Sequence, residues 1–86
     1  MMRFETGEGE NLAYLEYRFY KKDIALMHTF VPETMKGKGI ASALAEFSFN
    51  YAKENKKPVM VYCPFVAAYV KRHSEVKDQL DKEYLG

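Results

Sequence analysis

The sequence predicts an α/β fold in which antiparallel strands lead into a strand–helix–strand unit. Residues 12–20 alternate between apolar and mixed positions, and only three polar residues separate them from an apolar run at 24–31, which favours a hairpin. A glycine-containing loop, a helical repeat and a short apolar run at 59–63 follow. Strand, helix and strand in this order predict a right-handed crossover between parallel strands. We therefore expect a mixed sheet of about four strands with two to three helices.

Size and composition favour one cytoplasmic domain over residues 1–86. The chain has 48% hydrophobic residues, enough for a core without disulfides or metals, and a formal net charge of +1, which gives no support for nucleic-acid binding. No apolar run is long enough to span a membrane, and the N-terminus turns polar too early for a signal peptide. The single cysteine, Cys63, excludes an intrachain disulfide and a zinc site of several thiolates. We expect no metal.

The N-terminal half is predicted to form three strands. Residues 3–6 are compatible with a short strand, and the glycines and polar residues of 7–11 predict a turn. Residues 12–20 then form a strand with one buried face. The run at 24–31 is apolar on both faces apart from His28 and Thr29, which is typical of a central strand, and Pro32 ends it.

The main helix is predicted to run from near Gly39 to about Asn55. Its apolar residues recur at helical spacing and predict one buried face, made of Ile40, Leu44, Phe47 and Tyr51. Phe49 lies roughly opposite this face. Either the helix has a second covered side or Phe49 is partly exposed.

A short strand at 59–63 and a second helix are predicted to follow. Pro64 suits the first turn of that helix, and four residues share one of its faces: Phe65, Ala68, Tyr69 and Arg72. Residues 74–85 are charged with sparse apolar positions, and they predict either a weak C-terminal helix or a partly ordered tail.

The loop between the central strand and the main helix is a candidate anion site. Gly37 and Gly39 allow close approach to the backbone, and the helix that follows directs free N–H groups and a partial positive charge at the loop. A Walker loop is excluded because Ile40 follows Gly39 where that motif needs lysine. A dinucleotide fingerprint needs a third glycine where Ser42 stands.

The same loop carries a resemblance to a known family. Lys36-Gly37-Lys38-Gly39-Ile40-Ala41 resembles the Arg/Gln-x-x-Gly-x-Gly/Ala motif of the GNAT acetyltransferase superfamily. His28-Thr29-Phe30-Val31-Pro32 before the loop, and Cys63 followed by Tyr69-Val70-Lys71, are similar to its small single-motif members. The resemblance covers residues 12–75 and implies a compact GNAT-like fold. It departs at Lys36, where arginine or glutamine is usual, and at Ser74, where proline is usual.

The resemblance implies acetyl-CoA as cosubstrate. The pantetheine would lie along residues 28–31, the loop N–H groups would hold the pyrophosphate, and two lysines would attract the phosphates. Tyr69 either covers the cofactor or packs in the core. The implied cofactor-binding residues are Thr29, Phe30, Val31, Lys36, Gly37, Lys38, Gly39, Ile40, Ala41, Ser42 and Tyr69.

The catalytic residues that the resemblance implies are His28 and Cys63. An imidazole can take a proton from an amine, and a thiol can carry the acetyl group or protonate a leaving thiolate. The structural alternative places His28 as a satisfied core residue and Cys63 as a small buried one.

Two functions follow from different classes. The first is acetyl transfer to an amine acceptor, a protein lysine or a small polyamine. The second is an acyl-CoA-binding module without efficient transfer, and a scaffold in a larger complex is a weaker third. The hairpin at residues 21–23 leaves no room for helices that would build an acceptor pocket. We therefore expect a shallow acceptor site, or one completed by a partner or a second copy.

Overall fold

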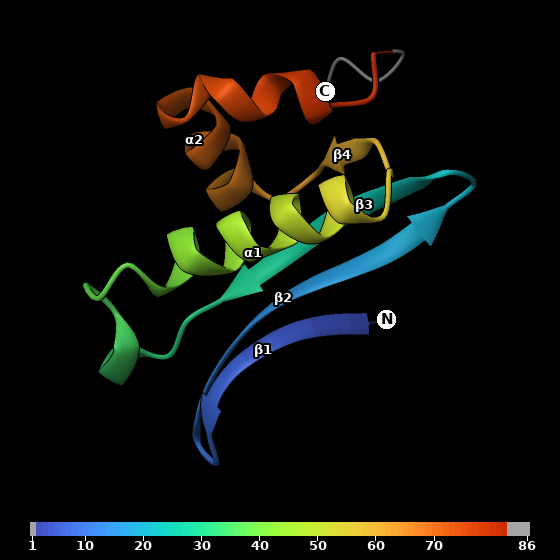
Figure 1. Ribbon diagram of the computed structural model, residues 1–86. Helices are drawn as coiled ribbons and strands as arrows, with labels where there is room; N and C mark the ends of the chain where they lie inside the picture. The colour runs from blue at the N-terminus through green and yellow to red at the C-terminus, as the bar shows by residue number, and fades with distance from the viewer. Residues whose placement is uncertain (1, 83–86) are drawn as a thin grey trace.

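The computed structural model describes residues 2–82 and contains one sheet with its helices on a single face (Figure 1). The strands lie in the order β1 (Met2–Glu8), β2 (Asn11–Tyr20), β3 (Asp23–Phe30) and β4 (Val59–Val61). The helices are η1 (Glu33–Met35), α1 (Ile40–Glu54), α2 (Pro64–Arg72) and η2 (Ser74–Gln79), of which η1 and η2 are 3₁₀ helices. β1 to β3 are antiparallel, and β3 and β4 are parallel across α1, which confirms the predicted α/β fold.

β1 is longer than the sequence predicted. Residues 7 and 8 stay in the strand, and the predicted turn shortens to Gly9 and Glu10. Gly7 makes this possible, because its φ is +108° and a Cβ there would lie 2.0 Å from the carbonyl oxygen of Asn11. Only glycine allows the two strands to approach so closely at that position.

A bulge in β3 decides which side chains face the helices. Glu16 pairs with His28, but the next residue of β2, Tyr17, pairs with Leu26, so Met27 has no partner. The extra residue shifts the alternation by one position. Leu26 and Thr29 are therefore both buried beneath the helices, whereas His28 is exposed.

β3 and β4 pair along only three residues each. The ladder ends at Leu26 and Val61, and the N–H of Tyr62 makes the last backbone bond to Leu26 O at 3.0 Å. β3 continues to Phe30, whereas the chain after β4 turns into α2 at Pro64. The two strands therefore separate, and the last residues of β3 keep a free edge on that side within the described chain.

α1 is covered on two sides, and this corrects the predicted buried face. Its buried residues are Leu44, Ala45, Ser48, Phe49 and Ala52. Phe49 is 1% exposed and stacks on Tyr69 of α2 at 5.9 Å, so the second covered side exists. Phe47, which the repeat assigned to the core, is 55% exposed at the side of the helix above β1.

These two phenylalanines should respond differently to the same substitution. Phe49→Leu is expected to lower the free energy of unfolding by about 1–2 kcal/mol, because it leaves a void against Tyr69. Phe47→Leu is expected to change the free energy of unfolding of a single subunit by less than about 0.5 kcal/mol, because the side chain is 55% exposed there. Urea unfolding of both variants measures this difference. Equal losses would contradict the assignment of the two faces.

The C-terminal part packs on the core through α2 and η2. α2 buries Val66, Tyr69 and Val70, whereas Phe65, which the repeat placed on the same face as Tyr69, is 59% exposed. Pro64 begins α2, as expected. Residues 74–79 form η2, which buries Val76. Residues 83–85 of the predicted tail lie outside the described residues. No helix in residues 2–82 has the length and apolar character needed to cross a membrane.

Candidate functional site

The loop between η1 and α1 presents backbone donors at the start of α1. Gly39 is the N-cap residue and has φ +72°, and Gly37 has φ +79°. The first helical backbone bond runs from the N–H of Ala43 to Gly39 O at 3.0 Å, and no side chain caps the helix. The N–H groups of Ile40, Ala41 and Ser42 therefore point out of the helix end, where the helix dipole is positive.

A pocket of about 320 Å³ lies at this helix end, beside the free edge of β3. It brings together nine of the eleven predicted cofactor-binding residues. They are Thr29, Phe30, Val31, Lys36, Gly37, Gly39, Ile40, Ala41 and Ser42. The pocket thus joins a cluster of backbone donors to the unpaired end of a strand.

Two residues that line the pocket were not predicted from the sequence. Met35 of η1 and Phe65 of α2 also line the cavity. Phe65 follows directly after the proline that begins α2. Its position just after a predicted strand could have indicated that it lines a site at the end of the sheet. Met35 had no signal, because a 3₁₀ turn of three residues has no periodicity that a sequence pattern reveals.

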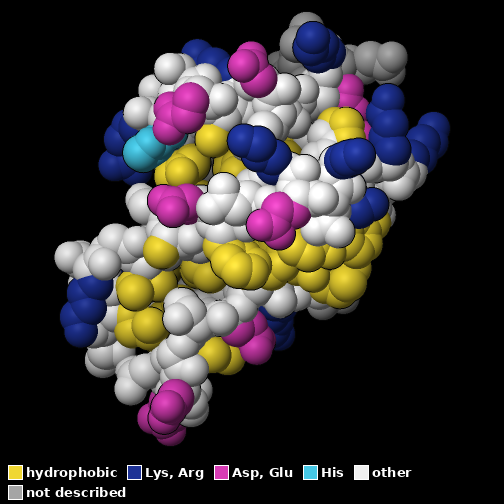
Figure 2. Space-filling model, in the orientation of Figure 1, with side chains coloured by type: hydrophobic (Ala, Val, Ile, Leu, Met, Phe, Trp, Pro, Cys, Tyr) yellow, Lys and Arg dark blue, Asp and Glu magenta, His cyan; other side chains and the backbone are white. Residues whose placement is uncertain are grey.

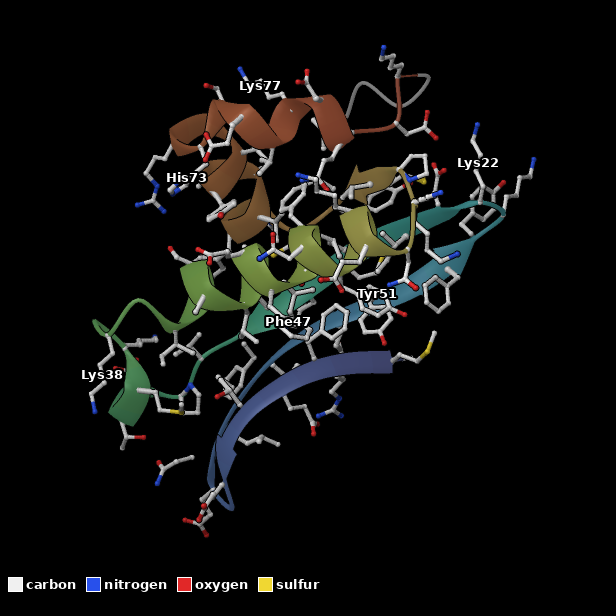
Figure 3. All side chains as sticks on the ribbon, viewed as in Figure 1. Lys22, Lys38, Phe47, Tyr51, His73 and Lys77 are labelled. Carbon is white, nitrogen blue, oxygen red and sulfur yellow. The ribbon has the colours of Figure 1, made fainter. Side chains whose placement is uncertain are left out.

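Two predicted residues do not line the pocket. Lys38 lies at the outer end of the loop (Figure 3). Tyr69 lies between the rings of Phe49 and His73, with the His73 ring at 4.3 Å. Burial raises the pKa of the Tyr69 hydroxyl above its ordinary value, and the carboxylates of Glu46 and Glu75 raise it further. In this structure Tyr69 packs in the core.

Cys63 is buried under the helices at the end of β4. Its side chain is 1% exposed, and Sγ lies 3.2 Å from Thr29 Oγ1, a hydrogen bond between the two separated strands. Cys63 is also the N-cap residue of α2, and its carbonyl oxygen accepts the N–H of Ala67 at 3.0 Å. The thiol therefore lies on the helix-covered face of the sheet, where β3 and β4 separate.

His28 lies on the opposite, uncovered face of the sheet. It is exposed, it pairs with Glu16 across the β2–β3 ladder, and its ring lies 6.4 Å from that of Tyr14. The structure places His28 and Cys63 on opposite faces, and it does not bring them into contact. Residues 2–82 contain no group of three His, Cys, Asp or Glu side chains that could hold a metal ion.

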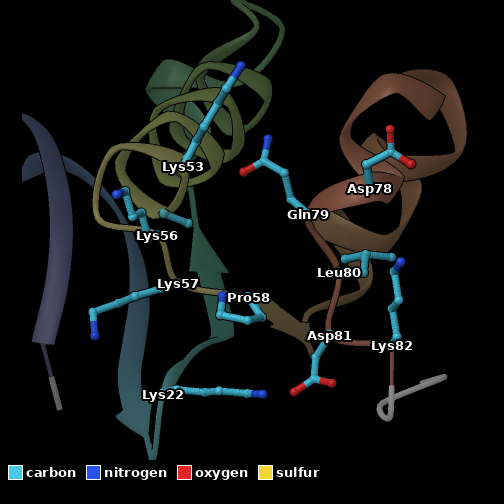
Figure 4. Close-up of a pocket in the computed structure, with 11 residues that line it drawn as sticks. Lys22, Lys53, Lys56, Lys57, Pro58, Asp78, Gln79, Leu80, Asp81 and Lys82 are labelled. Carbon is cyan, nitrogen blue, oxygen red and sulfur yellow. The ribbon is translucent and has the colours of Figure 1, made fainter.

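A second pocket, of about 440 Å³, lies at the other end of α1 (Figure 4). Five lysines line it: Lys22, Lys53, Lys56, Lys57 and Lys82. The C-terminal end of the helix dipole is negative, and Asp78 and Asp81 line the same cavity. These features offset part of the positive charge of the lysines, and this end of the helix offers carbonyl groups, whereas the first pocket offers backbone N–H donors.

Comparison with known proteins identifies the family of this chain. The sequence profile described as GCN5-related N-acetyl-transferase matches residues 3–79. The chain is also similar to Protein NATD1 of Xenopus tropicalis, with 34% identity over 62 residues, which cover 71% of this chain and 57% of that protein. The match thus spans little more than half the length of that relative. The profile covers most of the chain, and the chain therefore belongs to the GCN5-related N-acetyltransferase family.

Proposed function

We propose that this domain binds acetyl-CoA in the pocket at the start of α1 and transfers the acetyl group to an amine. One observation carries the proposal: the backbone donors at the start of α1 are continuous with the unpaired end of β3 in a single pocket. A ligand with an anionic middle and an extended amide-bearing arm fits this combination. Membership of the acetyltransferase family supports the same assignment.

The anionic part is assigned to the helix end. The N–H groups of Ile40, Ala41 and Ser42 would donate to pyrophosphate oxygens, aided by the helix dipole. Lys36 lines the pocket, but its Nζ already lies 2.7 Å from Glu33 Oε1. The backbone should therefore contribute most of the binding, and the lysine a smaller part that salt screens.

The extended arm is assigned to the free edge of β3. Residues 28–30 pair with β2 on one side and have no strand on the other within the described chain. Their backbone groups are available to the amides of the arm, as in the addition of a strand to a sheet. Phe30, Val31 and Phe65 supply apolar walls.

The position of His28 favours direct transfer over a covalent enzyme intermediate. An amine approaching the uncovered face meets the exposed imidazole, which takes the proton that the amine loses as its nitrogen bonds to the acetyl carbon. The carbon–sulfur bond breaks, and the sulfur leaves as the thiolate of CoA. Cys63 is buried on the other face and its thiol is hydrogen-bonded to the Thr29 hydroxyl, so it is poorly placed to carry the acetyl group.

An assay of CoA release tests the proposal. The protein is incubated with acetyl-CoA and a panel of amines, including polyamines and lysine peptides, and free thiol is measured against a reaction without amine. We expect release that depends on the amine and yields the acetylated product. Binding of acetyl-CoA without release for any amine would instead support the acyl-CoA-binding module. The uncovered acceptor face, which no helix of residues 2–82 encloses, is the observation that keeps this second function open.

A further inference from the structure

The two edges of the sheet differ. The outer edge of β4 is covered, because Val59 forms a parallel bridge with Leu80 and its carbonyl oxygen accepts the N–H of Asp81 at 2.9 Å. β1 forms the other edge and pairs only with β2 within residues 2–82. An open edge of seven residues offers unpaired backbone groups to another strand.

An apolar groove lies beside this edge. Figure 2 shows hydrophobic side chains gathered between α1 and β1. The ring of Phe4 in β1 packs against three other rings. Its centroid lies 4.1, 5.1 and 5.2 Å from the ring centroids of Tyr17, Phe47 and Tyr51. A cavity of about 450 Å³ runs between Phe4 and Phe47. Phe47 remains 55% exposed despite these contacts, so the chain's own side chains leave the groove open.

We propose that β1 of a second copy of this chain pairs with the β1 edge, antiparallel and centred on Phe4, so that the two copies cover each other's groove. The charges of β1 select this occupant and this register. Arg3 and Glu5 share the uncovered face of the strand, and Phe4 faces the helices. Centring on Phe4 places each Arg3 opposite the partner copy's glutamate and stacks the two Phe4 side chains, which is a self-complementary arrangement.

Two neighbouring registers would also keep the helices of both copies on the same face of the joined sheet, but both are less favourable. Centring on Glu5 places two glutamates opposite each other, and centring on Arg3 places two arginines opposite each other. Like charges directly across strands are destabilising. Arg3 already forms ion pairs within its own chain, at 3.7 Å from Glu5 and 3.8 Å from Glu16. Because a guanidinium has five N–H donors, Arg3 can also bind a glutamate of the second copy.

The helices are compatible with this pairing. α1 packs mainly over β2, so the two α1 helices would be separated by three strand spacings, or about 14 Å. Directly packed helices lie about 8–10 Å apart, so the backbones do not collide and the remaining space suits aromatic side chains. Phe47 of each copy would enter this space and become buried.

Charge exchange tests the proposal on the intact chain. Sedimentation or light scattering should give the wild type a mass of twice 10.0 kDa. Glu5→Arg and Arg3→Glu, measured singly, should each raise the dimer dissociation constant at least about tenfold, because like charges then face each other. An equal mixture of the two variants should recover the dimer, because the two arginines of one chain then face the two glutamates of the other.

A second pair of variants protects the test against misfolding. Phe47→Glu changes an exposed side chain of the groove and should weaken the dimer, whereas Asn50→Glu, exposed elsewhere on α1, should not. Circular dichroism confirms that each variant is folded. A wild type that stays at 10.0 kDa would overturn the proposal and leave the edge for a strand of another protein. A dimer unaffected by these variants, or a mixture that fails to recover it, would overturn it as well.

Discussion

Replacing His28 by alanine is expected to slow amine acetylation by about 10²–10⁴-fold, the usual loss when a general base is removed. The affinity for acetyl-CoA should change by less than about twofold, because binding rests on the loop and on the backbone of β3. His28 is exposed on the uncovered face, so its removal leaves the core intact. Initial rates at saturating acetyl-CoA, with the dissociation constant measured separately, give both quantities.

Arg18→Ala is the matched control for this substitution. Arg18 is an exposed β2 residue on the same uncovered face, paired with Ala25 rather than with His28. Its removal should leave the rate nearly unchanged. A similar rate for wild type and His28→Ala, with a confirmed acceptor, would assign His28 a structural role.

Experiments on Cys63 distinguish direct transfer from a route through an acetylated enzyme. Direct transfer predicts that mass spectrometry finds no acetylated protein after incubation with acetyl-CoA alone, and that Cys63→Ala retains turnover. A single acetyl group that hydroxylamine removes, and that is absent in Cys63→Ala, would show that the thiol carries the acetyl group. The hydrogen bond between Thr29 and Cys63 would then have to open during the reaction.

Replacing Ser42 by aspartate is expected to weaken acetyl-CoA binding by at least about hundredfold. Ser42 lines the pocket in the first turn of α1. A carboxylate about 5 Å from a phosphate repels it by roughly 3 kcal/mol at an effective dielectric constant near 20. The same carboxylate interacts favourably with the positive end of the helix dipole. The melting temperature of the free protein should therefore stay the same or rise while binding is lost.

Asn50→Asp gives the same change of charge on an exposed turn of α1, away from the pocket. It should leave binding unchanged. Ser42→Asp is a cleaner probe than a substitution of Gly39, because Gly39 has φ +72° and any side chain there would strain the backbone. Unaltered affinity in Ser42→Asp would move the phosphates away from this helix end.

The strand–loop–helix region was predictable because its signals are local. Alternation, the polar break before β3, Pro32 and the two glycines each act on neighbouring residues, and together they located the loop and the start of α1 correctly. The pocket lining followed from the same stretch. Apart from Phe65, its residues all lie between positions 29 and 42, so the chain itself brings them together.

The wrong predictions concern residues whose burial depends on a second helix or strand. The repeat of α1 identified one apolar stripe, but the helix packs on the sheet and on α2, so Phe49 is buried and Phe47 is left at the edge above β1. Likewise, the bulge at Met27 sends His28 to the uncovered face and Thr29 to the helical face. Neither the packing partner nor the extra residue in a ladder is visible in a single segment's pattern.

An NMR titration of the amide groups with acetyl-CoA tests the central claim most directly. The account predicts one saturable site, with the largest shifts at residues 28–31 and 37–42, and a gain in stability of about 2.7 kcal/mol at a hundredfold excess over the dissociation constant. Shifts confined to the lysine-lined pocket around Lys22, Lys53 and Lys57 would show only attraction of phosphate to surface cations. That result, or no shifts at millimolar acetyl-CoA, would contradict the proposed site.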